Sequence, residues 1–111
     1  MNKEQIIIDI KKELRSSMNG VASAAMRQTE DYRVNFGVEL PRLHSISTEF
    51  EPDHELAQAL WKESDRECRI LATILMPTSR FDEELCTVWA EDIHTVELAQ
   101  IFALNLMRRL P

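Results

Sequence analysis

Glycine and aromatic side chains are scarce in this sequence. Its 111 residues contain two glycines, Gly20 and Gly37, and aromatic residues make up 6% of the chain. Proteins rich in β-strands need many turn glycines and runs of β-branched or aromatic residues, so a sheet is disfavoured here. The chain is 44% hydrophobic and 29% charged, which is typical of a folded protein. We therefore predict an all-α fold.

Long apolar runs are missing as well. The three isoleucines at residues 6–8 are followed at once by Asp9 and Lys11. A membrane-spanning helix needs about 20 consecutive apolar residues, and a signal peptide needs a basic start followed by an apolar core. We therefore expect a cytoplasmic protein without a membrane partner. Cys68 and Cys86 fall on the apolar sides of predicted helices, so both thiols are expected to be free and buried.

Basic residues are in the minority, and the imbalance lies in the second half of the chain. The net charge is -6, because residues 1–50 carry 7 basic and 7 acidic groups whereas residues 51–111 carry 6 basic and 12 acidic groups. Nucleic-acid-binding domains usually present a basic patch that neutralises phosphates. The net charge therefore does not favour DNA as a partner.

Seven helices are predicted from apolar residues at helical spacing, over about residues 2–16, 20–30, 41–50, 52–63, 64–76, 85–93 and 95–110. Ser64 and Glu67 match a capping box at the fifth helix, in which Glu67 reaches back to the amide of Ser64. Thr95 is predicted to cap the seventh helix. Inward-facing residues are expected to include Val21, Ala22, Ala25 and Met26 of the second helix, and Leu85, Val88, Trp89 and Ile93 of the sixth.

The fourth and fifth helices share a pattern with the sixth and seventh. A glutamate, a tryptophan, a second glutamate and a methionine at residues 55, 61, 67 and 76 recur at residues 84, 89, 97 and 107, with offsets of 29, 28, 30 and 31. A helix pair that repeats at such spacing is typical of an α-solenoid, in which each pair buries its apolar face against its neighbours. The pattern predicts one domain over residues 1–111, built from about three antiparallel HEAT-like helix pairs.

Three segments resemble a known family. Residues 36–46 contain a Phe-Gly-Val triplet before a helix that begins with proline. Residues 54–72 contain His-Glu-Leu-Ala, Leu-Trp and a following Arg-Glu-x-Arg-Ile-Leu-Ala, and residues 89–92 form Trp-x-x-Asp. These segments are similar to the DNA alkylation repair (AlkD-like) glycosylase family, and the resemblance covers about residues 32–110.

The resemblance implies an activity and also its loss. Family members are expected to cup duplex DNA with HEAT-like helices and to excise cationic alkylated purines. An aspartate in a Trp-Asp-x-x-Asp pattern stabilises the positive charge that develops on the sugar. The matching residues here run from Val96 to Gln100, so Val96 replaces the aromatic residue and Gln100 replaces the catalytic aspartate. Glu97 is the remaining carboxylate candidate, and the family's arginine from a later repeat would lie beyond Pro111.

Other candidate sites have weaker patterns. Glu91 and His94 form one Glu-x-x-His motif, whereas a di-iron bundle needs two such motifs and further glutamates, so we expect no metal and no cofactor. Trp61 and Trp89 are interpreted as core residues. Three arginines, Arg42, Arg66 and Arg69, form a candidate set of phosphate ligands. The favoured interpretation is that they pair with neighbouring acidic side chains.

These observations favour a non-catalytic HEAT-like interaction module related to DNA alkylation repair proteins. The alternative is a DNA repair glycosylase, or a DNA-structure-binding protein, that acts on alkylated purines. The seventh predicted helix is apolar around its whole circumference, so we expect it to bind a protein partner or a second copy. The predicted centre of that homodimer interface is Phe102, Leu106 and Leu110.

Overall fold

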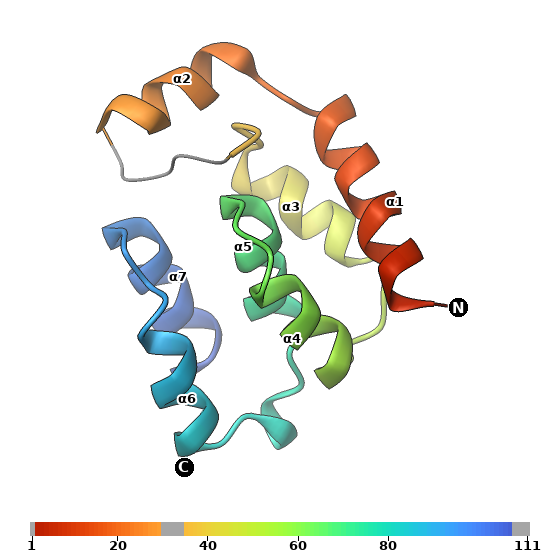
Figure 1. Ribbon diagram of the computed structural model, residues 1–111, viewed down its shortest axis with the longest axis vertical. Helices are drawn as coiled ribbons and strands as arrows, with labels where there is room; N and C mark the ends of the chain where they lie inside the picture. The colour runs from red at the N-terminus through yellow and green to blue at the C-terminus, as the bar shows by residue number, and fades with distance from the viewer. Residues whose placement is uncertain (1, 30–34, 108–111) are drawn as a thin grey trace.

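A computed structural model describes residues 2–29 and 35–107. These residues form seven α-helices and one 3₁₀ helix and contain no strand, so the all-α prediction is confirmed (Figure 1). No helix in this described part is long and apolar enough to cross a membrane. The elements are α1 Lys3–Ser16, α2 Gly20–Thr29, α3 Leu40–Ser47, α4 His54–Trp61, α5 Arg66–Leu75, η1 Thr78–Arg80, α6 Glu83–Ala90 and α7 Val96–Asn105.

Polar side chains define the starts of most helices, because an oxygen at the N-cap position accepts a backbone N–H that has no partner within the helix. The predicted cap Thr95 is confirmed, and it accepts from the amide of Leu98 at 3.1 Å. The third helix starts at Leu40, with Pro41 in its first turn, where the missing N–H costs nothing. The capping residues are Asn2, Asn19, Asp53, Asp65, Asp82 and Thr95.

The predicted capping box of α5 is wrong. Asp65, and not Ser64, is the N-cap, and its carboxylate accepts from the amide of Cys68 at 2.9 Å. Ser64 is exposed, and Glu67 bonds to other groups described below. A carboxylate at the N-cap accepts a hydrogen bond and also interacts favourably with the positive end of the helix dipole, which explains why the helix begins one residue later than predicted.

Helix α5 lies at the centre of the packing. It contacts α3, α4 and α7, and α1 packs on α4. In Figure 1, α4 and α5 lie between α1 on one side and the α6–α7 pair on the other. Eight of the ten residues of α5 are buried, whereas α7 has two buried residues over the same length. The helices on either side of α5 therefore share it as a common core element.

Four aromatic rings fill the space between α4, α6 and α7. Trp61 and Trp89 stack with their ring centroids 4.4 Å apart and an interplanar angle of 3°. Phe81 and Phe102 close the cluster with centroids 5.8 Å apart. The interpretation of both tryptophans as core residues is confirmed by their burial.

The predicted dimer centre is wrong for its first two residues. Phe102 and Leu106 are buried inside this chain, where they point towards the aromatic cluster and the other core helices, so neither is free to contact a partner. Leu110 lies outside the described residues. Helix α7 ends at Asn105, five residues before the predicted end.

The predicted apolar face of α2 turns inward only in part, because Ala22 and Met26 are half-buried. Val21 and Ala25 are exposed, whereas Ser23 is buried and donates from its hydroxyl to the carbonyl of Asn35 at 3.1 Å. Gly37, with φ of 67°, lies against the start of α2, where a Cβ atom would be 2.7 Å from the nitrogen of Ser23. This close backbone approach fixes which side of α2 turns inward.

A second inward assignment also fails. On α6, Trp89 is buried and Leu85 is half-buried, and Ile93, just after the helix, is half-buried too, as the pattern predicts; Val88, however, is exposed. Val88 lies on the side of α6 that points away from the aromatic cluster, because Trp89 occupies the inward position next to it. The apolar spacing alone did not decide which of these neighbouring residues faces the core.

Candidate functional site

The first two residues of α5 place opposite charges inside the protein. Glu67 is 0% exposed and Arg66 is 2% exposed. The guanidinium of Arg66 donates through Nη1 to Glu67 Oε2 and to the carbonyl of Val38, both at 2.8 Å. Glu67 also accepts from the backbone amides of Phe36 at 2.9 Å and Val38 at 3.2 Å. This network joins α5 to the segment that precedes α3.

Glu97, in the first turn of α7, completes the network on the other side of Arg66. Arg66 donates through Nε to Glu97 Oε1 at 2.7 Å and through Nη2 to Glu97 Oε2 at 3.1 Å, which is a bidentate pair. Burial lowers the pKa of Arg66, but hydrogen bonds and charges from Glu97 and Glu67 outweigh it and raise the pKa. Arg66 is therefore a permanent cation shared between two glutamates.

Arg69 binds two loop carbonyls. It donates through Nε to the carbonyl of Glu63 at 3.0 Å and through Nη1 to the carbonyl of Asp92 at 2.8 Å. Its guanidinium carbon lies 5.4 Å from the centroid of a Trp61 ring, within the range of a cation–π contact. The Trp61 indole in turn donates to Asp92 Oδ2 at 3.2 Å. Arg69 and Trp61 thus tie the loop after α4 to the loop after α6.

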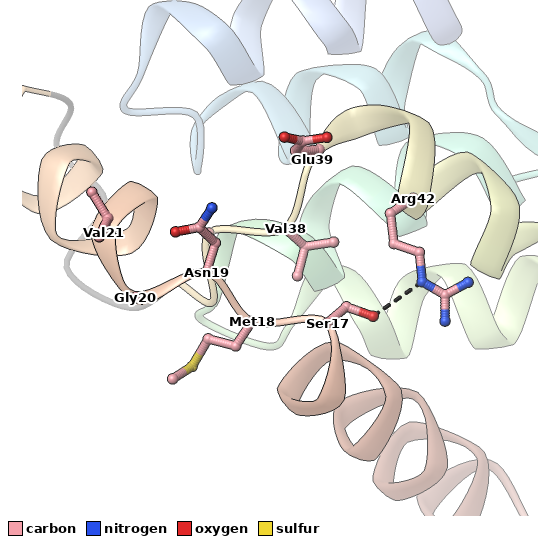
Figure 2. A pocket seen from close by; sticks show the side chains of 9 residues that line it. Ser17, Met18, Asn19, Gly20, Val21, Val38, Glu39 and Arg42 are labelled. Atoms are coloured by element: carbon pink, nitrogen blue, oxygen red, sulfur yellow. Dashed lines mark hydrogen bonds between the residues drawn. The ribbon is translucent and has the colours of Figure 1, made fainter.

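Arg42 is the exposed member of the predicted phosphate-facing set. Its Nε donates to Ser17 Oγ at 3.0 Å, and its Nη2 lies 3.9 Å from Glu13 Oε2. It borders a hollow of about 680 Å³ between the end of α1 and the start of α3. In Figure 2 its guanidinium points towards Ser17, away from Gly20 and Val21 on the far side of the hollow.

The three arginines therefore do not form one basic surface. Arg66 lies in the interior between two glutamates, Arg69 is committed to backbone carbonyls, and Arg42 is on a different part of the surface beside α1. The favoured interpretation, pairing with acidic neighbours, fits Arg66 in part. Arg66 pairs with adjacent Glu67, which is buried, and also with half-buried Glu97 of α7, which lies far away in the sequence.

A family model for DNA alkylation repair enzymes matches residues 10–110 of the chain. The chain belongs to the DNA alkylation repair enzyme family. No curated protein and no solved structure matches it. The family match extends the resemblance from residue 32 back to Ile10, so it includes the second half of α1.

The first turns of α7 contain the positions that match the family's aromatic residue and catalytic aspartate. Val96 and Gln100 are both exposed on one side of this helix. Glu97 is rotated from Val96 by about 100° and points to Arg66 on α5. The only carboxylate in this segment therefore lies off the side where the family pattern places its functional groups.

The remaining candidate groups are the Glu-x-x-His motif and the two cysteines. Among the described residues, no three His, Cys, Asp or Glu side chains are arranged to hold a metal ion, and both Glu91 and His94 are exposed. Burial, followed by the charge of Asp65, raises the pKa of the Cys68 thiol. Burial also raises the pKa of Cys86, but this thiol is half-buried and not buried as predicted.

Glu67 and Asp92 are the residues whose roles sequence reasoning missed. Both accept hydrogen bonds from groups about 30 residues earlier in the chain, namely Phe36 and Trp61. The sequence contains a signal for the role of Glu67, because Glu67 and Glu97 occupy equivalent positions of the predicted repeat. Two glutamates at the same place in successive pairs suggest a contact between pairs, whereas the capping box assumed a contact within one helix.

Proposed function

We propose that this chain is a non-catalytic interaction module of the DNA alkylation repair family, built as a short α-solenoid. The observation that carries this proposal is the bidentate pair between Glu97 and buried Arg66. A carboxylate that stabilises a sugar cation must be free to approach it, whereas both oxygens of Glu97 accept from one guanidinium. We assign this carboxylate a structural role, which is to join α7 to α5 through Arg66.

The cost of releasing Glu97 supports this assignment. Turning Glu97 towards a substrate would leave Arg66 buried beside a single carboxylate. Breaking a buried ion pair costs about 3–5 kcal/mol, and the partial exposure of Glu97, at 28%, lowers that figure here. The neighbouring groups offer no compensation: Val96 cannot stack on a base as an aromatic ring does, and the neutral amide of Gln100 cannot supply an anion.

The solenoid part of the proposal rests on contacts that repeat. Glu67 bonds to the segment before α3, and Glu97, 30 residues later, bonds to the start of α5. Trp61 and Trp89 lie in the last turns of α4 and α6 and stack on each other. Helices α3, α5 and α7 then form one layer, with each later helix attached to the previous one through its first turn.

An assay of base release tests the absence of catalysis. Duplex DNA treated with a methylating agent is incubated with the chain, and free 3-methyladenine and 7-methylguanine are measured by mass spectrometry. An active family member is the positive control. We expect no release above background from the wild type, because Glu97, the candidate carboxylate, is held by Arg66.

Two variants make the assay specific. Glu97→Gln removes the candidate carboxylate, and Glu91→Gln is the matched control because it neutralises an exposed glutamate at the end of α6. Circular dichroism establishes that each variant is folded. Base release by the wild type that is lost in Glu97→Gln and kept in Glu91→Gln would overturn the proposal.

Family membership is the observation that favours the alternative, a glycosylase or DNA-structure-binding protein. Of the predicted phosphate-facing arginines, Arg42 is exposed, and one phosphate contact gives a slope of about -0.9 for log affinity against log salt. Fluorescence anisotropy with duplex DNA at several salt concentrations measures this slope. A much steeper slope would indicate further phosphate contacts and would support the alternative.

A further inference from the structure

In the layer of α3, α5 and α7, one face of α5 packs against α7. Its residues Arg66, Ile70 and Thr73 are spaced i, i+4 and i+7, so they share one face. Both ends of that face contact α7, because Arg66 pairs with Glu97 and Thr73 Oγ1 accepts from Asn105 Nδ2 at 3.0 Å. All three residues are buried. This face is the one that a following helix covers.

The same face of α7 is uncovered. With the offset of 30 that relates Glu67 to Glu97, the residues of α7 that correspond to the covered face of α5 are Val96, Gln100 and Ala103. All three are exposed. Ala99 and Leu104 beside them and Met107 beyond the helix end are exposed too. We call these six residues the α7 face.

The α7 face differs in chemistry from the rest of the surface. None of its six residues is charged, in a chain of which 29% is charged and whose net charge is -6. The one acidic side chain of α7, Glu97, is turned to Arg66 and already paired. Arg66 of α5 pairs with a glutamate of the following helix, and the corresponding residue of α7 is Val96. A helix that covers α7 therefore needs an apolar side chain, and not a glutamate, opposite Val96.

We infer that the α7 face binds the α7 face of a second copy of this chain, through a twofold axis near Gln100 and Ala103. This inference rests on the proposed function and names the partner of the interaction module. An uncharged face can meet itself without like-charge repulsion, which an acidic surface cannot do. Small residues at Ala99 and Ala103 let two helices approach closely, and a twofold arrangement is the commonest one for identical chains. The interface thus excludes Phe102 and Leu106, which are buried inside the chain.

Size-exclusion chromatography with light scattering measures the oligomeric state of the full chain. The double variant Val96→Glu/Leu104→Glu places charges on the α7 face. The matched control Val21→Glu/Val88→Glu adds the same charge at exposed valines of α2 and α6; Val88 is 53% exposed, close to the 58% of Leu104. We expect a wild-type dimer, an unchanged control, and a dimer Kd raised at least about 100-fold in the α7-face variant.

A cysteine placed near the axis gives an independent readout. In the Cys86→Ser background, Ala103→Cys should form a disulfide between copies on mild oxidation, because a twofold axis brings this position close to its own counterpart, within the Cα separation of about 7 Å that a disulfide tolerates. Val21→Cys in the same background should not crosslink. The positions are informative whether or not the glutamate variants fold, because cysteine replaces a small exposed side chain.

The outcomes separate the inference from the proposed function. A dimer that the α7-face variant disrupts, together with the Ala103→Cys crosslink, supports the inference. A wild-type chain that is still a monomer at about 1 mM, or a dimer disrupted only by the control variant, overturns it. A monomer that releases no methylated base would overturn this inference alone, whereas base release by the wild type would overturn the proposed function whatever the oligomeric state.

Discussion

The buried carboxylate of Glu67 offers a direct test of how this fold is held together. In Glu67→Ala, the amides of Phe36 and Val38 lose their acceptor, and Arg66 loses one of its two carboxylates. A buried donor without a partner costs about 1–3 kcal/mol, and breaking a buried charged pair costs about 3–5 kcal/mol in total. Because Arg66 keeps Glu97, we expect the loss in the free energy of unfolding to be about 3–5 kcal/mol and not the sum of all terms.

Urea denaturation followed by circular dichroism measures this loss. Typical domains have about 5–15 kcal/mol in total, so the midpoint should fall strongly while the slope of free energy against urea stays the same. Glu84→Ala is the matched control, because this glutamate also lies in the first turn of a helix but is exposed, and we expect a change within about 0.5 kcal/mol. Glu67→Gln should give an intermediate loss, since the amide retains one acceptor oxygen. A loss below about 1 kcal/mol in Glu67→Ala would refute the reasoning.

Two further predictions concern backbone conformation and thiol reactivity. Gly37→Ala should lower the free energy of unfolding by at least about 1–3 kcal/mol, because φ is 67° and the new Cβ atom meets the start of α2. Gly20→Ala is the control, and it should be neutral or slightly stabilising because the space around Gly20 is open. Equal thermal midpoints for the two variants would contradict the assignment. Cys86 should react with a thiol reagent in the native protein, whereas Cys68 should react only on unfolding, because Cys68 is buried and burial raises the pKa of its thiol. Mass spectrometry of labelled peptides measures the order of labelling. Equally fast labelling of both cysteines would contradict this prediction.

The helices and their polar caps could be read from the sequence because both depend on residues that are close together in the chain. Thr95 accepts from the amide of Leu98, three residues away, and needs nothing distant to do so. The same local reasoning failed at Ser64, because Asp65, one residue later, is the cap and Glu67 accepts from Phe36. Local patterns therefore predict that a cap exists better than they predict which of two adjacent residues supplies it.

The candidate site was predictable in its residues but not in their relations. Arg66 and Glu97 were both singled out, one as a phosphate ligand and the other as a catalytic candidate, yet they bind each other. Their separation of 31 residues spans α5, η1, α6 and the segments between them, so only the packing of α7 on α5 brings them within hydrogen-bond distance. An arginine pattern cannot show whether the guanidinium faces solvent or a carboxylate from a later helix.

The sequence by itself determined the all-helical class, the approximate helix boundaries and the membership in the DNA alkylation repair family, since each follows from local spacing or from recognisable segments. The tertiary structure decided which side of each helix is inward. An apolar helix such as α7 has no preferred side of its own, and packing on Trp61 and Phe81 buries Phe102 while Leu104 is left exposed. Helix α2 is oriented by the contact of Gly37 with its backbone, which leaves Val21 and Ala25 exposed. Burial depends on which neighbours are present, and neighbours in space are distant in sequence.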